Sequence, residues 1–263
     1  MSNARPKVSC LVVTADRRRF LRRSLLAFQA QTYPHRELVV VDDGREPLDD
    51  LLAALPAGQV QYIRLEKEPE NTLGRLRNIS IEAAGGDYLT IWDDDDWYHP
   101  DRLSIQVSAL QGRCDSCIMS SALIHIDSPE FFLHPFLARF PGGVPATLLF
   151  KNDRVPRYPE LRRGEDAVFL KAWKSRPQAR LDESSAHLQI RCHHGRNTWD
   201  RDHFVHRLTK TPRDAASYAW SKFVRRDLFR HRGFRLSARS REAFGLFLKD
   251  SRRVDLFPEE GRG

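Results

Sequence analysis

The first half of the chain alternates short apolar runs with segments in which apolar residues recur at helical spacing. The apolar runs predict four strands, at residues 8–14, 37–43, 60–65 and 87–92, and the first two have the composition of buried strands. The segments between and after them predict helices at residues 20–31, 48–55, 73–86 and 100–112. Strands separated by helices of this length predict an α/β fold, with a mostly parallel sheet flanked by helices.

The second half of the chain has a less regular pattern. Apolar runs predict strands at residues 117–126 and 145–150, and a further strand runs into a polar turn within residues 185–199. A helix is predicted over residues 164–175, with acids in its first turn where the helix dipole favours them. From about residue 212 the pattern is helical and basic, which predicts a helical C-terminal appendage.

The composition is typical of a soluble globular protein, with 41% hydrophobic and 30% charged residues. No apolar run approaches the roughly 20 residues of a membrane span, and the N-terminal residues lack the apolar core of a signal peptide. Four cysteines in 263 residues do not indicate a disulfide scaffold. We therefore expect a reducing, cytoplasmic setting.

The formal net charge of +8 is unevenly distributed along the chain. Residues 201–263 hold 16 of the 43 Lys and Arg but 8 of the 35 Asp and Glu, so residues 1–200 are balanced at 27 of each. The excess positive charge of the C-terminal segment bears on binding partners rather than on the fold.

Polar side chains stand at the ends of three predicted strands. The first strand ends in Thr14, the second in Asp42 and Asp43, and the fourth is followed by the acidic run Asp93 to Asp96. Ligands of parallel sheets bind in the crevice at the carboxyl ends of the strands. The sequence therefore predicts a binding site at this edge of the sheet.

The acidic run at residues 93–96 has three interpretations. It is a solvated acidic turn, with Asp96 capping the next helix; a calcium loop; or a hard-cation site that helps to hold the phosphates of a substrate. The spacing does not match the usual calcium loop, which carries a glycine and a distal glutamate. Mg²⁺ and Mn²⁺ sites use one or two carboxylates plus phosphate oxygens, and a bound cation would relieve the repulsion within the run.

Two stretches together resemble a known family. They are "VSCLVVTADRRRFLRRSLLAFQAQTYPHRELVVVDDG" and "NTLGRLRNISIEAAGGDYLTIWDDDDWYHPDRL". They resemble the nucleotide-sugar half of family 2 glycosyltransferases, which have the Rossmann-like GT-A fold, over roughly residues 7–110. The resemblance implies a GT-A domain at residues 1–200, with a nucleotide-sugar half at 1–112 and an acceptor half at 113–200. Residues 201–263 are then a basic helical extension.

The resemblance implies roles for residues on the donor side. Thr14 matches the position that contacts the nucleobase or ribose. Asp43 matches the acid that accepts a hydrogen bond from the base, with Asp42 as the alternative. Arg77 and Asn78 match a pair that lies near the sugar and phosphates.

The D-x-D motif of the family falls on Asp93 and Asp95. Asp95 is the first choice for a ligand of Mn²⁺ or Mg²⁺, and Asp94 is expected to face the ribose. Two departures bear on base and phosphate recognition: "ADRRR" follows Thr14 in place of an aromatic or Asn pair, and Arg45 stands where a serine is common.

A second acidic site and a histidine pair complete the expected machinery. Glu165 and Asp166 match the "ED" pair of the family, which implies that Asp166 is the general base and Glu165 supports it; the alternative is that both acids only complement a helix N-terminus. His193 or His194 is expected to complete the metal shell or bind the diphosphate, the alternative being a polar surface turn. Trp97, just past the acids, is the candidate wall of the site.

These features predict a metal-dependent, inverting glycosyltransferase. The expected donor is a nucleoside-diphosphate sugar, a UDP-sugar first, and the acceptor is a hydroxyl of a glycan or lipid-linked saccharide. Two alternatives stay open: a sugar nucleotidyltransferase, whose usual glycine-rich loop after the first strand is missing here, and an inactive nucleotide-sugar-binding module.

The basic tail also has several interpretations. It packs onto the domain through Trp220, Phe223 and Phe229; it attaches peripherally to the anionic inner face of the membrane; or it binds nucleic acid or an acidic glycan. No nucleic-acid motif accompanies the charge, so nucleic acid is not the expected partner.

Overall fold

The computed structural model describes residues 5–153, 156–197 and 200–258. The chain forms two compact units, which we describe separately. The first unit comprises the chain up to Asp95 together with Pro100–Ile118 and Pro145–Arg180. The second unit comprises Asp96–His99, Met119–Val144 and the chain from Leu181 onward.

The first unit is built on a seven-stranded sheet in the order β10-β6-β9-β4-β1-β2-β3. Strand β1 pairs in parallel with β2 and β4, and β2 with β3, whereas β9 is antiparallel to both β4 and β6. The sheet is therefore mostly parallel, as predicted. The strand bounds are β1 Val8–Thr14, β2 Arg36–Asp42, β3 Val60–Arg64, β4 Tyr88–Ile91, β6 Ser116–Met119, β9 Leu149–Lys151 and β10 Gln178–Leu181.

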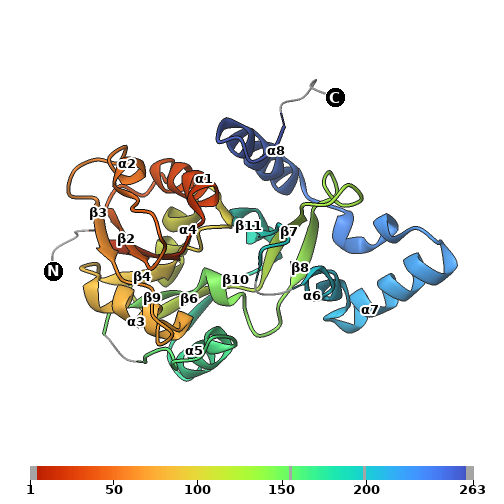
Figure 1. Cartoon of the computed structure of the whole chain (residues 1–263). Helices are drawn as coiled ribbons and strands as arrows, with labels where there is room; N and C mark the ends of the chain where they lie inside the picture. The colour runs from red at the N-terminus through yellow and green to blue at the C-terminus, as the bar shows by residue number, and fades with distance from the viewer. Residues whose placement is uncertain (1–4, 154–155, 198–199, 259–263) are drawn as a thin grey trace. The chain divides into compact units, whose positions relative to one another are not determined.

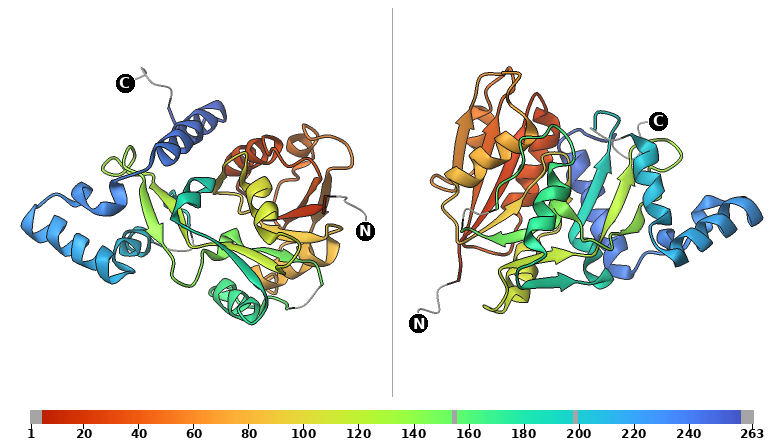
Figure 2. Two further views of the ribbon diagram at one scale, coloured as in Figure 1. Left: turned by 180° about the vertical axis from the view of Figure 1, so that it is seen from behind. Right: turned by 90° about the horizontal axis from the view of Figure 1, so that it is seen from below.

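Helices flank this sheet, which confirms the predicted α/β class (Figures 1 and 2). Their apolar faces and the strand residues form a core that includes Leu11, Val39, Phe169 and Trp173. The Thr72 hydroxyl caps α3 by accepting a hydrogen bond from the Arg75 amide. The helix bounds are α1 Arg18–Gln29, α2 Asp49–Leu52, α3 Leu73–Ala83, α4 Arg102–Leu110 and α5 Glu165–Trp173, with a 3₁₀ turn at Pro145–Thr147.

The second unit holds a smaller sheet in the order β5-β11-β7-β8. Strand β11 is parallel to β7 and antiparallel to β5, and β7 is antiparallel to β8. The bounds are β5 Trp97–Tyr98, β7 Ser121–Ile126, β8 Phe136–Arg139, β11 Gln189–His193, α6 Arg201–Val205, α7 Pro212–Ala219 and α8 Ala238–Arg253. Short turns lie at Glu183–Leu188, His206–Thr209, Trp220–Val224, Leu228–Arg230 and Arg232–Phe234.

The compact units divide the chain at other places than the boundaries predicted from sequence. The single strand predicted at 117–126 is two strands, because the chain leaves the large sheet after β6 and enters the small one as β7. The described part of the C-terminal segment lies in the second unit. Its residues Phe204, Leu208 and Phe234 share one apolar cluster with Phe136 of β8, so it belongs to the core of the second unit.

No helix within the described ranges has both the length and the apolar character needed to cross a membrane.

A close backbone approach at Gly74 in α3 yields a test of this fold. A Cβ atom at Gly74 would lie 1.9 Å from the carbonyl oxygen of Pro159, whereas one at Gly245 in α8 would meet nothing within 4 Å. We expect Gly74→Ala to lower the free energy of unfolding by about 1–3 kcal/mol through overpacking. Gly245→Ala should raise it by about 1 kcal/mol through helix propensity. Chemical denaturation measures both free energies of unfolding. A Gly74→Ala variant that is more stable than the wild type would contradict the close contact between Gly74 and Pro159.

Candidate active site

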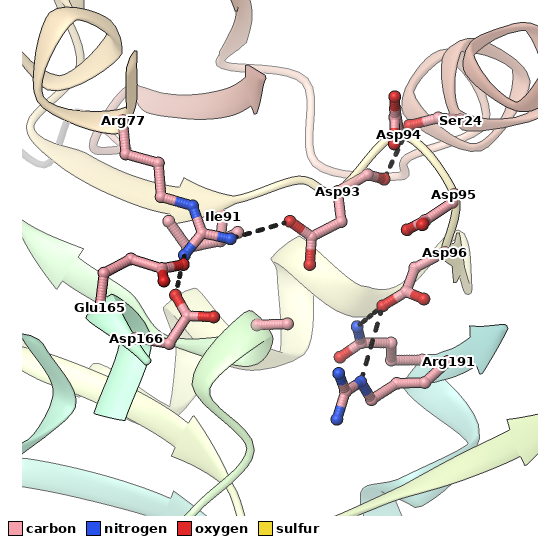
Figure 3. A network of polar contacts seen from close by, with 12 residues as sticks. Ser24, Arg77, Ile91, Asp93, Asp94, Asp95, Asp96, Glu165, Asp166 and Arg191 are labelled. Carbon is pink, nitrogen blue, oxygen red and sulfur yellow. Dashed lines mark hydrogen bonds and ion pairs between the residues drawn. The ribbon is translucent and has the colours of Figure 1, made fainter. Parts of the chain in front are cut away.

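The acidic run follows β4, whose last residues are buried. Trp92 is fully buried, as predicted, and packs edge-on against Phe28 with 6.1 Å between ring centroids. The chain then passes through the four acids, and their side chains have different partners (Figure 3). Asp93, Asp94 and Asp95 belong to the first unit and Asp96 to the second.

Asp94 is joined to the end of the neighbouring strand β1. Its carboxylate is 2% exposed and accepts a hydrogen bond from the Thr14 hydroxyl at 2.6 Å. The Arg17 guanidinium donates to Asp94 at 3.2 Å and to Asp95 at 3.0 Å. Burial raises the pKa of Asp94 to about 7, and the adjacent Asp95 carboxylate adds to the shift. Thr14 and Asp94 thus meet at the strand ends where the sequence predicts a site.

Asp93 and Asp95, the residues of the D-x-D motif, each contact an arginine. Asp93 accepts from Arg77 at 3.4 Å and its side chain is 28% exposed, while the Asp95 side chain is 14% exposed. Mg²⁺ and Mn²⁺ are commonly held by one or two carboxylates together with phosphate oxygens. The two carboxylates of the motif therefore fit such a cation. A cation at Asp95 would have to replace or share the contact with Arg17. In the described part of the chain, no three His, Cys, Asp or Glu side chains are grouped so that they could hold a metal ion.

Arg77 is the centre of a second charged network in the first unit. Its guanidinium is buried, and it donates to Glu165 at 2.9 Å and also contacts Asp166 and Asp93 (Figure 3). Burial alone would lower the pKa of Arg77, but Tyr158, Asp93 and Glu165 raise it on balance. The sequence placed Arg77 beside the sugar and phosphates of a donor. The structure instead engages the buried guanidinium with three carboxylates, which supply the counter-charge that a buried cation needs.

Glu165 and Asp166 begin α5, as predicted. Gly164 precedes them at φ 80°, a left-handed conformation that favours glycine. Glu165 is 3% exposed, whereas the Asp166 side chain is 34% exposed. Of the pair, Asp166 is therefore the one that a substrate can reach.

Asn78 does not have the role expected from the sequence. Its amide donates to the Tyr158 carbonyl at 2.9 Å, and its side-chain oxygen accepts from the Tyr158 amide at 2.9 Å. Both ends of the side chain thus hold the segment that precedes α5. Asn78 therefore positions backbone near the acids.

The hydrogen bonds of Asp42 and Asp43 differ, and they indicate different roles for the two side chains. Asp42 is 1% exposed and accepts from the Gly44 amide at 2.8 Å and from the Tyr62 hydroxyl at 2.9 Å, which closes the turn after β2. Burial raises the pKa of Asp43, and its amide donates to the Thr14 carbonyl at 3.4 Å. This favours Asp43 over the alternative Asp42 as the group available to a ligand.

Two expectations about the second unit are wrong. Asp96 does not cap α4, which Asp101 precedes. It accepts instead from the Gln189 side chain at 2.7 Å and the Cys192 amide at 3.0 Å, and so ties β5 to β11. Trp97 is 1% exposed and its indole donates to Asp250 at 2.8 Å. It is a core residue, and a buried ring of this kind cannot be the wall of a site.

His193 and His194 lie at the end of β11 in the second unit. Burial lowers the pKa of His193, and the neighbouring His194 lowers it further. The His194 amide donates to the Asn197 side chain at 2.7 Å, within a turn that contains Gly195 at φ 77°. A role of either histidine in a metal shell with Asp93 and Asp95 stays a prediction.

Sequence reasoning missed a set of arginines that hold the acidic run or the strand β4 that precedes it. Besides Arg17, Arg23 is 1% exposed and donates to the Asp95 carbonyl at 2.5 Å. Arg102 is fully buried and donates to the Thr90 hydroxyl at 3.0 Å and the Ile91 carbonyl at 3.2 Å. Arginines on amphipathic helices are usually solvated, so the pattern alone hides these three. The run "ADRRR", where the family has other residues, is a signal for Arg17 alone.

Comparison of the fold with solved structures defines the class of protein. The structure of S. aureus TarS 1-349 in complex with UDP-GlcNAc superposes with a TM-score of 0.59 at 16% identity, over 95% of this chain and 83% of that chain. At this identity the likeness concerns the fold alone, and it confirms the GT-A-type fold.

Sequence comparison then identifies the family. The model of glycosyl transferase family 2 matches residues 9–164, and the chain belongs to this family. Succinoglycan biosynthesis protein ExoW of Rhizobium meliloti is 28% identical over 156 residues, which are 58% of this chain and 47% of that protein. A Bacillus subtilis protein named as the uncharacterized glycosyltransferase YwdF is 31% identical over 94 residues, 36% of this chain and 34% of that protein. The chain thus spans half or less of the length of these curated relatives.

The raised pKa of Asp94 predicts a pH-dependent stability. A carboxyl group whose pKa is raised on folding contributes stability that is present below about pH 4 and is lost as the pH rises through about 7. Asp94→Asn cannot ionise, so its melting temperature relative to the wild type should increase over this interval. Thermal denaturation with a metal chelator present measures the difference. A difference that is constant with pH would contradict burial as the cause.

Proposed function

We propose that the protein is a metal-dependent, inverting glycosyltransferase that moves a sugar from a nucleoside-diphosphate sugar to an acceptor hydroxyl. The observation that carries the proposal is the charged network of the first unit. Through Arg77 it connects Asp93, at the end of β4, to Asp166, at the start of α5. A donor-binding carboxylate and a candidate base are thereby held in one network.

The donor side of the proposal rests on Thr14, Asp43 and Asp94. Carboxylates and hydroxyls accept hydrogen bonds from the N–H groups of a base and from ribose hydroxyls. TarS, which shares the fold, has been solved with UDP and with UDP-GlcNAc, and this supports a UDP-sugar as the donor. Asp94 is directed to the ribose in this proposal, with Thr14 and Asp43 nearer the base.

Asp95 and Asp93 would hold Mn²⁺ or Mg²⁺ jointly with phosphate oxygens of the donor. Such a cation, when bound, stabilises the negative charge that develops on a leaving diphosphate. Arg17 would then give up Asp95 and become available to the diphosphate oxygens, which accept readily from a guanidinium. Arg17, which departs from the family's usual pattern after β1, would thereby take part in phosphate recognition.

Asp166 is the proposed general base. It accepts the proton of the acceptor hydroxyl as the new C–O bond forms at the anomeric carbon and the bond from that carbon to the diphosphate oxygen breaks. Its contact with Arg77 orients the carboxylate, and Glu165 shares the same guanidinium and supports that geometry. A single displacement of this kind inverts the anomeric configuration.

The acceptor we propose is a glycan or a lipid-linked saccharide, on the cytoplasmic side of the membrane. ExoW is named for succinoglycan biosynthesis, which supports a place in polysaccharide synthesis.

Asp166→Asn tests the assignment of the base. We expect kcat to fall by about 10²–10⁴-fold, the usual contribution of a general base, while the KM for the donor changes little. Asp49→Asn is the matched control, since Asp49 is also an acid in the first turn of a helix and should leave kcat unchanged. Steady-state kinetics with a nucleotide sugar, together with a UDP-binding assay on the folded variant, measures both. Full turnover by Asp166→Asn would contradict the role.

A further inference from the structure

Among the described residues of the second unit, three of the four exposed large apolar side chains lie in one turn after α7. Trp220, Phe223 and Val224 are 56%, 71% and 57% exposed. Exposing such side chains costs the favourable free energy of burying them, so a cluster of them marks an interaction surface more often than single exposed residues do. One of the interpretations of the tail is that Trp220, Phe223 and Phe229 pack onto the domain. The exposure of Trp220 and Phe223 contradicts it for these two, whereas Phe229 packs against the apolar cluster of the unit.

Basic residues alternate with these apolar residues. Lys222, Arg225 and Arg226 are all exposed, so every residue from 222 to 226 faces solvent. We call residues 220–226 the aromatic–basic turn. Figures 1 and 2 show α7, in light blue, extending away from β8 within the second unit.

The acids near the aromatic–basic turn are engaged elsewhere. Asp227 pairs with Arg230 at 3.2 Å and accepts from the Phe229 amide at 3.0 Å. Asp214 is 1% exposed and pairs with Arg139 at 2.8 Å. The surface that the turn presents is therefore positively charged as well as apolar.

The turn is held by ordered backbone. Residues Trp220–Val224 form a π-helical turn that continues α7, and the Arg225 amide donates to the Trp220 carbonyl at 3.0 Å. Ser221 is 2% exposed, and its carbonyl accepts from the Asp227 amide at 3.0 Å. The backbone of the turn is thus fixed by hydrogen bonds and by the buried Ser221, and this backbone holds the apolar side chains in exposed positions.

We propose that the aromatic–basic turn docks onto an anionic phospholipid surface. Trp220 and Phe223 enter the boundary between headgroups and acyl chains, where aromatic rings are favoured. Lys222, Arg225 and Arg226 bind the lipid phosphates, and their apolar stems lie along the boundary. The charge of the whole C-terminal segment, 16 basic against 8 acidic residues, complements such a surface. The proposal does not rest on the transfer reaction, and it would bring the protein to where lipid-linked saccharides reside.

Co-sedimentation with phospholipid vesicles tests the docking of the full chain. The probes are vesicles of phosphatidylcholine with phosphatidylglycerol and vesicles of phosphatidylcholine alone. We expect binding to the anionic vesicles that weakens with added salt, since a basic residue at such a surface contributes roughly five-fold to partitioning. Trp220→Ser with Phe223→Ser, and separately Lys222→Gln with Arg225→Gln and Arg226→Gln, should each weaken vesicle binding at least about ten-fold. Both variants should keep the wild-type melting temperature, because the side chains changed are exposed.

Matched variants elsewhere in the second unit control for general hydrophobicity and charge. Leu133→Ser changes a side chain that is 64% exposed outside the turn. Arg235→Gln with Arg239→Gln and Lys249→Gln removes the same number of charges from exposed positions. Point variants are preferable to deleting residues 201–263, because that deletion removes the core residues Phe204, Leu208 and Phe247.

Three results would overturn the proposal. The wild type fails to bind anionic vesicles; the control charge variant loses as much binding as the turn variant; or the aromatic variant binds as well as the wild type. Self-association in solution that disappears in the aromatic variant, or tighter binding to single-stranded oligonucleotide than to vesicles, would also overturn it by assigning the turn to another partner.

Discussion

The arrangement of the site depends on one buried cation, the guanidinium of Arg77. A charge in this position is costly unless it is paired, and here it meets Asp93, Glu165 and Asp166. These contacts join α3 and the end of β4 to the first turn of α5. Gly74, one turn earlier in α3, allows the segment before α5 to approach, and Asn78 holds that segment through Tyr158. Both the backbone contacts of α3 and the ion pairs of Arg77 therefore hold Glu165 and Asp166 in place.

The same principle applies to the acidic run as a whole. Four adjacent carboxylates would repel one another, but the fold gives each of them a different set of donors. Arg17 contacts Asp94 and Asp95, Arg77 contacts Asp93, and Gln189 binds Asp96 in the second unit. A divalent cation would enter a site whose charge is already partly balanced by arginine. Exchange of Arg17 for the cation is therefore part of the proposed binding step.

The parts of the fold and site that follow from local pattern could be predicted from the sequence. Apolar runs determine β1, β2 and β4, and adjacent parallel strands bring Thr14 and Asp94 together at their carboxyl ends. Side-chain partners distant in the chain could not be predicted in this way, such as Arg77 and Glu165, which are 88 residues apart. Trp97, Trp220 and Phe229 are all aromatic neighbours of charged residues, and only the packed structure separates the buried from the exposed.

The central claim is our proposal that the protein transfers a sugar from a nucleotide sugar with the help of a cation held by the acidic run. The most direct measurement is release of nucleoside diphosphate from a panel of nucleotide sugars, with Mn²⁺ and with a chelator, by the wild type and by Asp95→Ala. We predict release of UDP from a UDP-sugar with Mn²⁺, and its loss in the chelator and in the variant. Nucleotide-sugar binding without any release, or release of pyrophosphate from a nucleoside triphosphate, would contradict the claim.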